Sequence, residues 1–284
     1  MKTYTKRTPA DICLLCQKNP ADKTGSHIVS NMLTNGLFGK DKRGKIYVLD
    51  VKSQDAKFQK EPRQQTPVES YLFCSCCEDR MGKIETYIGN TFFSRHRRAI
   101  YKKDFPILHQ QLLGRGQFNY LIPTKVSPLI FSLFAWMQLW RASVATHEAF
   151  THIKLSEQIE EKLRIHLDSC LKEHWKLTET YCINNIDSFT EFVYTVSIPQ
   201  GKFDGEKQLL GILFTENTYF AYAAGMLFIY GLNGFGKNGV GYNNGHKPLE
   251  IALVSMKKWD EWKLQAALPS SYHPFIKATL ESVK

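Results

Sequence analysis

Apolar residues in the second half of the chain follow helical spacing first and strand spacing afterwards. The segment from Ser127 to about residue 150 is apolar on nearly all sides, which predicts a helix buried in the centre of the fold. Ser127 followed by Pro128 is a typical helix start, because serine caps the first turn and proline is tolerated there. Ser156 caps a second predicted helix that runs to about residue 175. Its apolar face repeats every fourth residue and consists of Ile159, Leu163, Leu167 and Leu171.

From about residue 181 the pattern is typical of β-strands separated by turns. The predicted strands span residues 189–198, 209–215, 218–230 and 249–256. We expect them to form an antiparallel sheet packed on the two helices. The predicted fold class is therefore α+β, and residues 105–284 form an α+β domain with helices at 127–176 and antiparallel strands at 187–260.

The N-terminal third is more polar, and its apolar runs are short. Residues 45–51 alternate and predict a strand, whereas residues 52–68 are polar and predict a flexible loop. A short strand at residues 68–73 leads to a helix at about residues 77–90. We expect residues 1–104 to form a separate ββα module.

Two Cys-x-x-Cys units lie in this module, Cys13 with Cys16 and Cys74 with Cys77. Such a unit aims two thiolates at one ion, and two units complete a tetrahedral zinc site. The first unit lies in a polar loop and the second opens a helix, which suggests a treble-clef zinc site with an insertion of 57 residues between the pairs. A redox pair or a disulfide is the alternative, and Cys76 could compete with Cys74 as a ligand. The remaining cysteines, Cys170 and Cys182, are expected to be core residues.

Composition limits the possible domain sizes and cellular locations of the protein. The chain has 284 residues of which 43% are apolar, enough for one large or two modest domains. No positively charged leader opens it, and its apolar runs are shorter than the ~20 residues that span a bilayer. We therefore expect no membrane association and a reducing cytoplasm, where thiolates bind metal instead of oxidising.

The net charge of +10 is concentrated near the N-terminus. Residues 1–104 hold 20 Lys and Arg against 11 Asp and Glu, while residues 105–284 hold 17 against 16. Such a surplus indicates a polyanionic partner, DNA or RNA, for the zinc module. The densest patch spans residues 92–103, and its candidate phosphate-binding residues are Arg95, Arg97, Arg98, Lys102 and Lys103. A solvated helix face is the alternative explanation of this patch.

A histidine shortly after the first cysteine pair, then a strand hairpin, then a second pair opening a helix resembles the zinc-supported HNH (His-Me finger) nucleases. The chain is similar to a bacterial HNH-like group linked to antiphage defence. The residues that carry this resemblance are Cys13, Cys16, Ser26-His27-Ile28, Leu72-Phe73-Cys74, Cys77-Glu78, Glu85 and Trp140-Arg141. They cover the N-terminal third well and the remainder only through one dipeptide.

The resemblance implies that His27 is the general base that activates water, and that Glu78 lies where the helix supplies a ligand to catalytic Mg²⁺ or Mn²⁺. Glu85 lies seven residues further on and shares a helix face with Glu78. Asn31 could orient the His27 ring, and Glu69 is a third candidate carboxylate. The chain departs from the family in two places, because Ser26 replaces an acidic or histidine ligand and Glu78 replaces histidine or asparagine. A structural role for His27, or a place on zinc, is therefore the alternative.

Arg141 lies on the apolar helix, where an unpaired charge would be costly. We expect it to pair with Glu160, Glu161 or Asp168, and contact with substrate phosphate is a further alternative.

The leading hypothesis is a metal-dependent endonuclease that hydrolyses phosphodiester bonds in DNA or RNA. The alternative is a non-catalytic module in which the zinc domain binds nucleic acid and residues 105–284 bind a protein partner. A third possibility places an effector or ligand-sensing function in residues 105–284.

Overall fold

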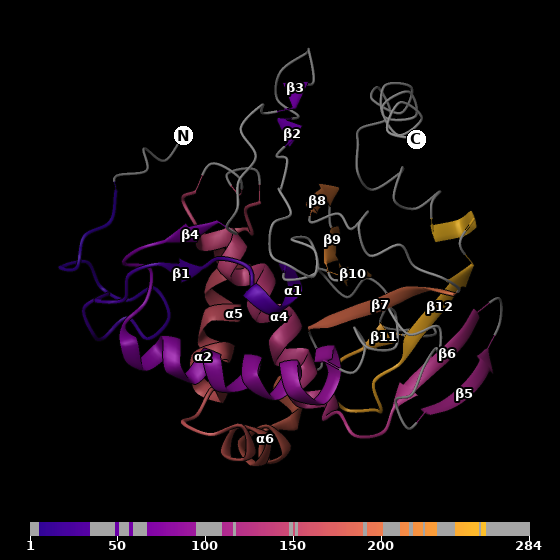
Figure 1. The fold of residues 1–284 in the computed structure, drawn as a ribbon. Coiled ribbons are helices and arrows are strands. Elements are labelled where there is room, and N and C mark those ends of the chain that lie inside the picture. The colour runs from indigo at the N-terminus through magenta and orange to yellow at the C-terminus, as the bar shows by residue number, and fades with distance from the viewer. Residues whose placement is uncertain are drawn as a thin grey trace.

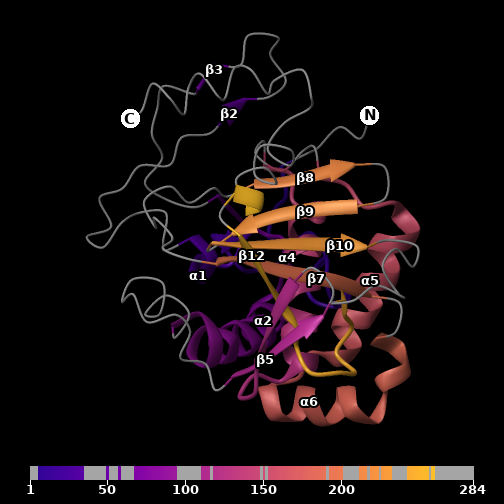
Figure 2. The same ribbon diagram turned by 90° about the vertical axis from the view of Figure 1, so that its right-hand side faces the viewer.

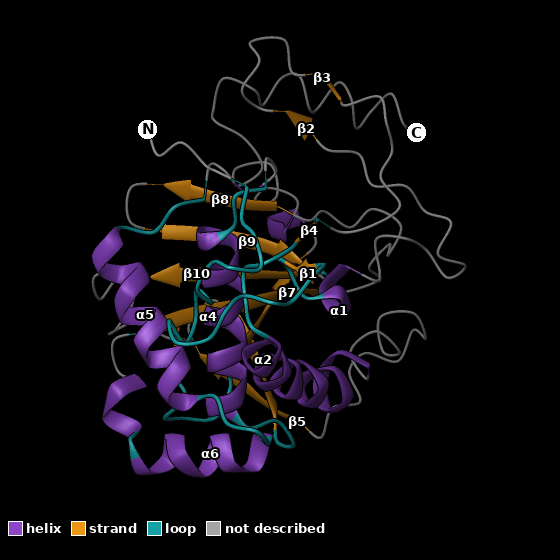
Figure 3. Ribbon diagram, turned by 90° about the vertical axis from the view of Figure 1, so that its left-hand side faces the viewer, coloured by secondary structure: helices purple, strands orange, loops and turns teal. Residues whose placement is uncertain are grey.

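The computed structural model describes residues 6–34, 49–50, 57–58, 67–94, 110–115, 118–147, 150, 153–189, 192–200, 211–215, 218–223, 225–231, 242–255 and 257–259. Within these residues the chain is α+β, as predicted. Helices lie on one face of a large sheet (Figure 1). Figure 2 views the molecule from the side of the sheet, and Figure 3 views it from the side of the helices.

The large sheet has eight strands, and most of its pairs are antiparallel. Its order is β5-β6-β12-β7-β10-β9-β8, with β11 paired to β7 off this path. The strands are β5 (Gln110–Arg115), β6 (Phe118–Pro123), β7 (Val193–Gln200), β8 (Gly211–Thr215), β9 (Thr218–Ala223), β10 (Met226–Gly231), β11 (Tyr242–Asn243) and β12 (Ile251–Ser255). The exception to the antiparallel prediction is β12, which runs parallel to β7 with Ile251 opposite Val196.

Two predictions about the strands are wrong. Residues 218–230 form two strands instead of one, because Gly225 adopts a positive φ of 73° and turns the chain between β9 and β10. This left-handed conformation suits glycine, which has no Cβ to clash. Strands β5 and β6 precede the helices, so the sheet begins before residue 127 instead of after the helical segment.

The central helix α4 (Pro128–Val144) is confirmed, and Ser127 caps it by accepting a hydrogen bond from the backbone N–H of Ile130. Every residue from Leu129 to Ser143 is buried. The second predicted helix is α5 (Glu157–Cys170), which ends before the predicted end at about residue 175, and the sequence did not predict α6 (Trp175–Asn184) or the short 3-10 helix η3 (Ile186–Phe189) that follow it. The strand-like pattern expected from residue 181 is therefore wrong, since the first strand after the helices begins at residue 193.

The N-terminal part consists of short strands around one long helix. Its elements are β1 (Ser26–His27), α1 (Asn31–Thr34), β2 (Leu49–Asp50), β3 (Lys57–Phe58), β4 (Val68–Glu69), α2 (Ser75–Ile88) and the π-helix η1 (Gly89–Phe93). Strand β1 pairs antiparallel with β4, and β2 pairs antiparallel with β3. Strand β3 thus lies inside the segment 52–68 that was predicted to be a loop.

Helix α4 connects the two parts of the molecule. On one side Phe131 stacks against Tyr194 of β7 and Phe228 of β10. On the other side Phe73, which precedes α2, lies 5.8 Å from Trp140 between ring centroids. The buried apolar residues of both parts form one continuous cluster. Among the helices described, none has the length and apolar character needed to cross a membrane.

Candidate metal centre and the adjoining histidine site

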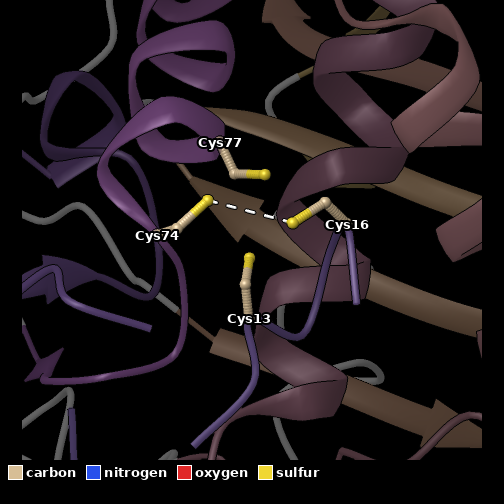
Figure 4. A group of neighbouring side chains, drawn as sticks. All are labelled: Cys13, Cys16, Cys74 and Cys77. Atoms are coloured by element: carbon tan, nitrogen blue, oxygen red, sulfur yellow. Dashed lines mark hydrogen bonds between the residues drawn. The ribbon is translucent and has the colours of Figure 1, made fainter. Parts of the chain in front are cut away.

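The four predicted zinc ligands, Cys13, Cys16, Cys74 and Cys77, are buried and come together in space. Their sulfur atoms all lie within 4.8 Å of one another. Figure 4 shows the four side chains pointing toward a common centre, and the sulfur atoms of Cys16 and Cys74 lie 3.9 Å apart. Zn–S bonds of about 2.3 Å in a tetrahedron separate neighbouring sulfurs by about 3.8 Å. The group could therefore hold a metal such as zinc, and its donor set fits that ion.

Backbone hydrogen bonds hold the two cysteine pairs together. The N–H of Cys13 donates to the carbonyl of Asn19 at 2.8 Å and closes the first turn. The N–H of Leu14 donates to the carbonyl of Leu72 at 2.9 Å, which ties this turn to the segment before α2. Asp22 then accepts from the backbone N–H of Ser75 at 2.7 Å and satisfies a donor in the first turn of α2. Both pairs are thus positioned by the chain itself.

The surroundings of Cys13 favour its thiolate, the form that binds metal, whereas burial raises the pKa of Cys74 and the hydrogen bond to Cys13 raises the pKa of Cys77. A guanidinium nitrogen of Arg80 donates to the sulfur of Cys77 at 3.0 Å and to a carboxylate oxygen of Asp168 at 2.7 Å. The hydrogen bond from the Cys77 thiol, supported by nearby backbone N–H groups, holds the pKa of Cys13 well below its ordinary value. Cys76, the alternative ligand, is exposed and lies outside the cluster.

His27 lies on β1, the first strand after the turn that carries Cys13 and Cys16. Gly25 precedes the strand with a φ of 66°, and the N–H of Gly25 donates to the Ser70 hydroxyl at 3.1 Å. The His27 side chain is half-buried. Burial, followed by the positive charge of Arg141, lowers its pKa, although the nearby carboxylates of Glu85 and Glu78 oppose this shift. The imidazole is therefore neutral at neutral pH and able to accept a proton.

Arg141 on α4 connects the elements of this site. Its Nη1 donates to Oε1 of Glu85 at 2.8 Å, and its Nη2 lies 3.5 Å from Oε1 of Glu78. Nη2 also donates to the backbone carbonyl of His27. The hydroxyl of Ser26 donates to the other carboxylate oxygen of Glu78 at 3.2 Å. Glu78 and Glu85 thus share one face of α2, as their spacing predicts.

The prediction that Arg141 pairs with a carboxylate is confirmed, but the partners named for it are wrong. Glu160 accepts a hydrogen bond from Ser143, while Glu161 and Asp168 pair with other arginines. The reason is the orientation of α4, which turns Arg141 toward α2 and β1. At 1% exposure the guanidinium is enclosed by protein, which argues against a direct contact with substrate phosphate.

Gln138, one helical turn before Arg141, was not anticipated from the sequence. Its side-chain oxygen accepts a hydrogen bond from the backbone N–H of Ser30 at 2.8 Å. Gln138 and Arg141 therefore both bind the backbone of the segment that begins with His27. Two polar residues three positions apart share a helix face, and that pattern inside an apolar helix was the available signal.

The remaining predicted site residues are Glu69, Asn31 and the basic candidates, and Glu69 lies opposite Ser26 in the pairing of β4 with β1. Glu69 lies on β4 and accepts hydrogen bonds from the backbone N–H groups of Thr146 and His147 at 2.8 and 3.0 Å. Asn31 is exposed and begins α1, so its role in orienting His27 stays a prediction. The basic candidates Arg95, Arg97, Arg98, Lys102 and Lys103 lie outside the described residues.

The chain was compared with known proteins at three levels. No protein-family model, curated protein or solved structure matches it.

Proposed function

We propose that this chain is a zinc-supported nuclease of the HNH-like type that hydrolyses phosphodiester bonds in DNA or RNA, with His27 as the general base. The observation that carries the proposal is the position of His27. It lies on the strand that pairs with β4 ahead of helix α2, and that helix begins at the second cysteine pair. The charged groups that act on its imidazole are Arg141, Glu85 and Glu78. A treble-clef arrangement of the zinc site belongs to the same proposal.

The proposed chemistry starts from neutral imidazole. His27 accepts a proton from a water molecule, and the water oxygen forms a bond to phosphorus. The bond between phosphorus and the leaving sugar oxygen breaks, and the leaving oxygen takes a proton from solvent. A positioned general base contributes about 10²–10⁴-fold to such a step. The lowered pKa of His27 keeps the base in its active form at neutral pH.

Zinc has a structural role in this proposal. The four thiolates clamp the turn before β1 to the start of α2, so that His27 and the acidic face of α2 are held in one arrangement. The surplus of positive charge in residues 1–104 favours a polyanionic substrate. Defence against phage in a bacterial cytoplasm is the setting that the family resemblance suggests.

The experiment compares cleavage of plasmid DNA, single-stranded DNA and RNA by wild type and by His27→Ala. The exposed His246 provides a matched control as His246→Ala. We expect His27→Ala to lose at least about 100-fold in rate, and His246→Ala to keep the wild-type rate. Zinc content measured on both variants separates a catalytic role from a ligand role. Equal cleavage by wild type and His27→Ala would refute His27 as the base.

A non-catalytic module is the second candidate function. It is favoured by the hydrogen bond from Ser26 to Glu78 and by the ion pairs of Arg141, which give every acidic group of the site a structural partner. In that case zinc-loaded protein binds nucleic acid in a salt-sensitive manner without cleaving it, and residues 105–284 bind a protein partner.

A further inference from the structure

The divalent cation implied by the family resemblance does not fit the site as it is built. Mg²⁺ requires near-octahedral oxygen ligands at about 2.0–2.1 Å, and Mn²⁺ suits the same ligands. Glu78 and Glu85 are the oxygen donors next to His27, but the guanidinium of Arg141 already contacts both of them. Over the described part of the chain, the four cysteines are the single group of three or more His, Cys, Asp or Glu ligands that converge on one point.

Both oxygens of Glu78 are already engaged. Oε1 faces Nη2 of Arg141 at 3.5 Å, and Oε2 accepts the hydrogen bond from Ser26 at 3.2 Å. Ser26 stands where the family has an acidic or histidine ligand, and here its hydroxyl is used as a donor to a carboxylate. A metal ion at this place would have to displace the guanidinium and reverse the role of the serine.

A guanidinium is suited to hold these groups. It is planar, carries a permanent positive charge and offers donors in a fixed fork. In this chain the fork spans three elements, because Nη1 binds Glu85 of α2 and Nη2 binds the carbonyl of His27 on β1 while the side chain comes from α4. The side chain of Arg141 is 1% exposed, so its position is fixed by the protein around it.

We infer that the guanidinium of Arg141 is the resident cation of this site, and that it takes the place of a divalent ion at Glu78 and Glu85. Arg141 is then a positioning residue: it fixes the strand that carries His27 against the acidic face of α2. The site needs no Mg²⁺ or Mn²⁺ at these carboxylates. The inference deepens the proposed function. Of the two tests below, only the cleavage assay rests on that function, and the Mn²⁺ titration does not.

The first test is a binding measurement that does not depend on activity. Mn²⁺ is titrated into the zinc-loaded full-length chain, and free Mn²⁺ is followed by electron paramagnetic resonance. We expect no saturable Mn²⁺ binding at these carboxylates in the wild type over the titrated concentrations, which sets a lower limit on its dissociation constant. Arg141→Met frees both carboxylates and is expected to bind Mn²⁺ at least about tenfold more tightly than wild type. The control Arg164→Met also removes a paired arginine, away from Glu78 and Glu85, and should behave as wild type once its zinc content is confirmed, because Arg164 also donates to the carbonyl of Leu15 at 2.7 Å.

The wild-type titration decides the inference even where Arg141→Met does not fold. One Mn²⁺ bound per wild-type chain and lost in Glu85→Gln would overturn it. Failure of a folded Arg141→Met to gain affinity over wild type would overturn it as well, because the guanidinium would not be what keeps the ion out.

The second test is cleavage after removal of free divalent ions with a chelator, with elemental analysis confirming that zinc remains. We expect the rate to stay within about twofold of the untreated protein. Cleavage that is lost and then restored by added Mg²⁺ overturns the inference and leaves the proposed nuclease function standing. A complete lack of cleavage in every condition refutes the proposed function, and the Mn²⁺ titration still decides which cation the site holds.

Discussion

The ion pair between Glu85 and Arg141 is expected to stabilise the fold more than a typical surface pair. Exposed ion pairs contribute about 0–1 kcal/mol, because water solvates both partners nearly as well when they are apart. Here the guanidinium is 1% exposed and the carboxylate 22%, with 2.8 Å between Nη1 and Oε1. The guanidinium therefore cannot recover its hydration when its partner is lost.

The change that isolates this contact is Glu85→Gln, which keeps the shape of the side chain and removes its charge. A hydrogen bond to a charged group contributes about 1.5–3 kcal/mol, and removal of one partner of a fully buried pair costs about 3–5 kcal/mol. Glu78 stays within 3.5 Å of the guanidinium, and Glu85 itself is partly in water. We therefore expect Glu85→Gln to lower the free energy of unfolding by about 2 kcal/mol.

Glu161→Gln is the matched control. Its carboxylate lies 2.7 Å from Arg164, but it is 49% exposed, so we expect a loss below about 1 kcal/mol. Urea unfolding of zinc-loaded protein measures both variants, and an unchanged slope with urea shows that the same transition is compared. Equal losses in the two variants, or a loss under about 0.5 kcal/mol in Glu85→Gln, would show that Arg141 is not held by its carboxylates.

Three further results are expected. Cys16→Ser should lose the bound zinc, measured by elemental analysis, and melt at lower temperature, whereas Cys182→Ser, at a cysteine that is also buried but lies outside the cluster, should keep the metal. The pKa of His27 is lower in the folded chain than in the unfolded chain. As the pH falls below about 6.5, the unfolded chain therefore takes up a proton at His27 before the folded chain does, and the free energy of unfolding decreases. The loss of unfolding free energy between about pH 7.5 and about pH 5.5 should accordingly be smaller in His27→Gln. Ser143→Ala removes a buried hydroxyl that donates to Glu160 at 2.6 Å, and should cost about 1–2 kcal/mol in the same unfolding assay.

The parts of the fold that were predictable from the sequence are those fixed by local chemistry. Ser127 and Ser156 cap α4 and α5, because a serine side chain accepts a hydrogen bond from the third residue of its own helix. The convergence of the four cysteines was predictable because two Cys-x-x-Cys units in one module are typical of a tetrahedral zinc site.

The parts that were not predictable depend on residues far apart in the sequence. The parallel pairing of β12 with β7 joins residues more than fifty positions apart, and nothing in either strand specifies it. Helix α5 ends at Cys170, before the predicted end at about residue 175, and α6 follows, ending among residues that the sequence predicted to be strand-like. Strand β12 and helix α5 were therefore predicted as elements, whereas the pairing of β12 and the existence of α6 were not.

The partners of Arg141 were missed for a related reason. In a helix that is apolar on one side, the sequence indicates which face is buried, and the polar residues can then be assigned to the solvent side. Helix α4 is buried on all sides, so its sequence gives no direction for Arg141. Only the packing of Phe131 and Trp136 on the sheet turns the remaining face, with Gln138 and Arg141, toward β1 and α2.

This packing makes the second half of the chain part of the site. Trp136 contacts Tyr230 of β10 on the sheet side of α4, and one turn further on Arg141 binds the carbonyl of His27. Protein interiors are close-packed and do not deform smoothly, so a shift of α4 on the sheet is transmitted to the guanidinium. Because a hydrogen bond of 2.8 Å to Glu85 tolerates little displacement, the sheet determines whether the acidic face of α2 and the strand of His27 stay in register.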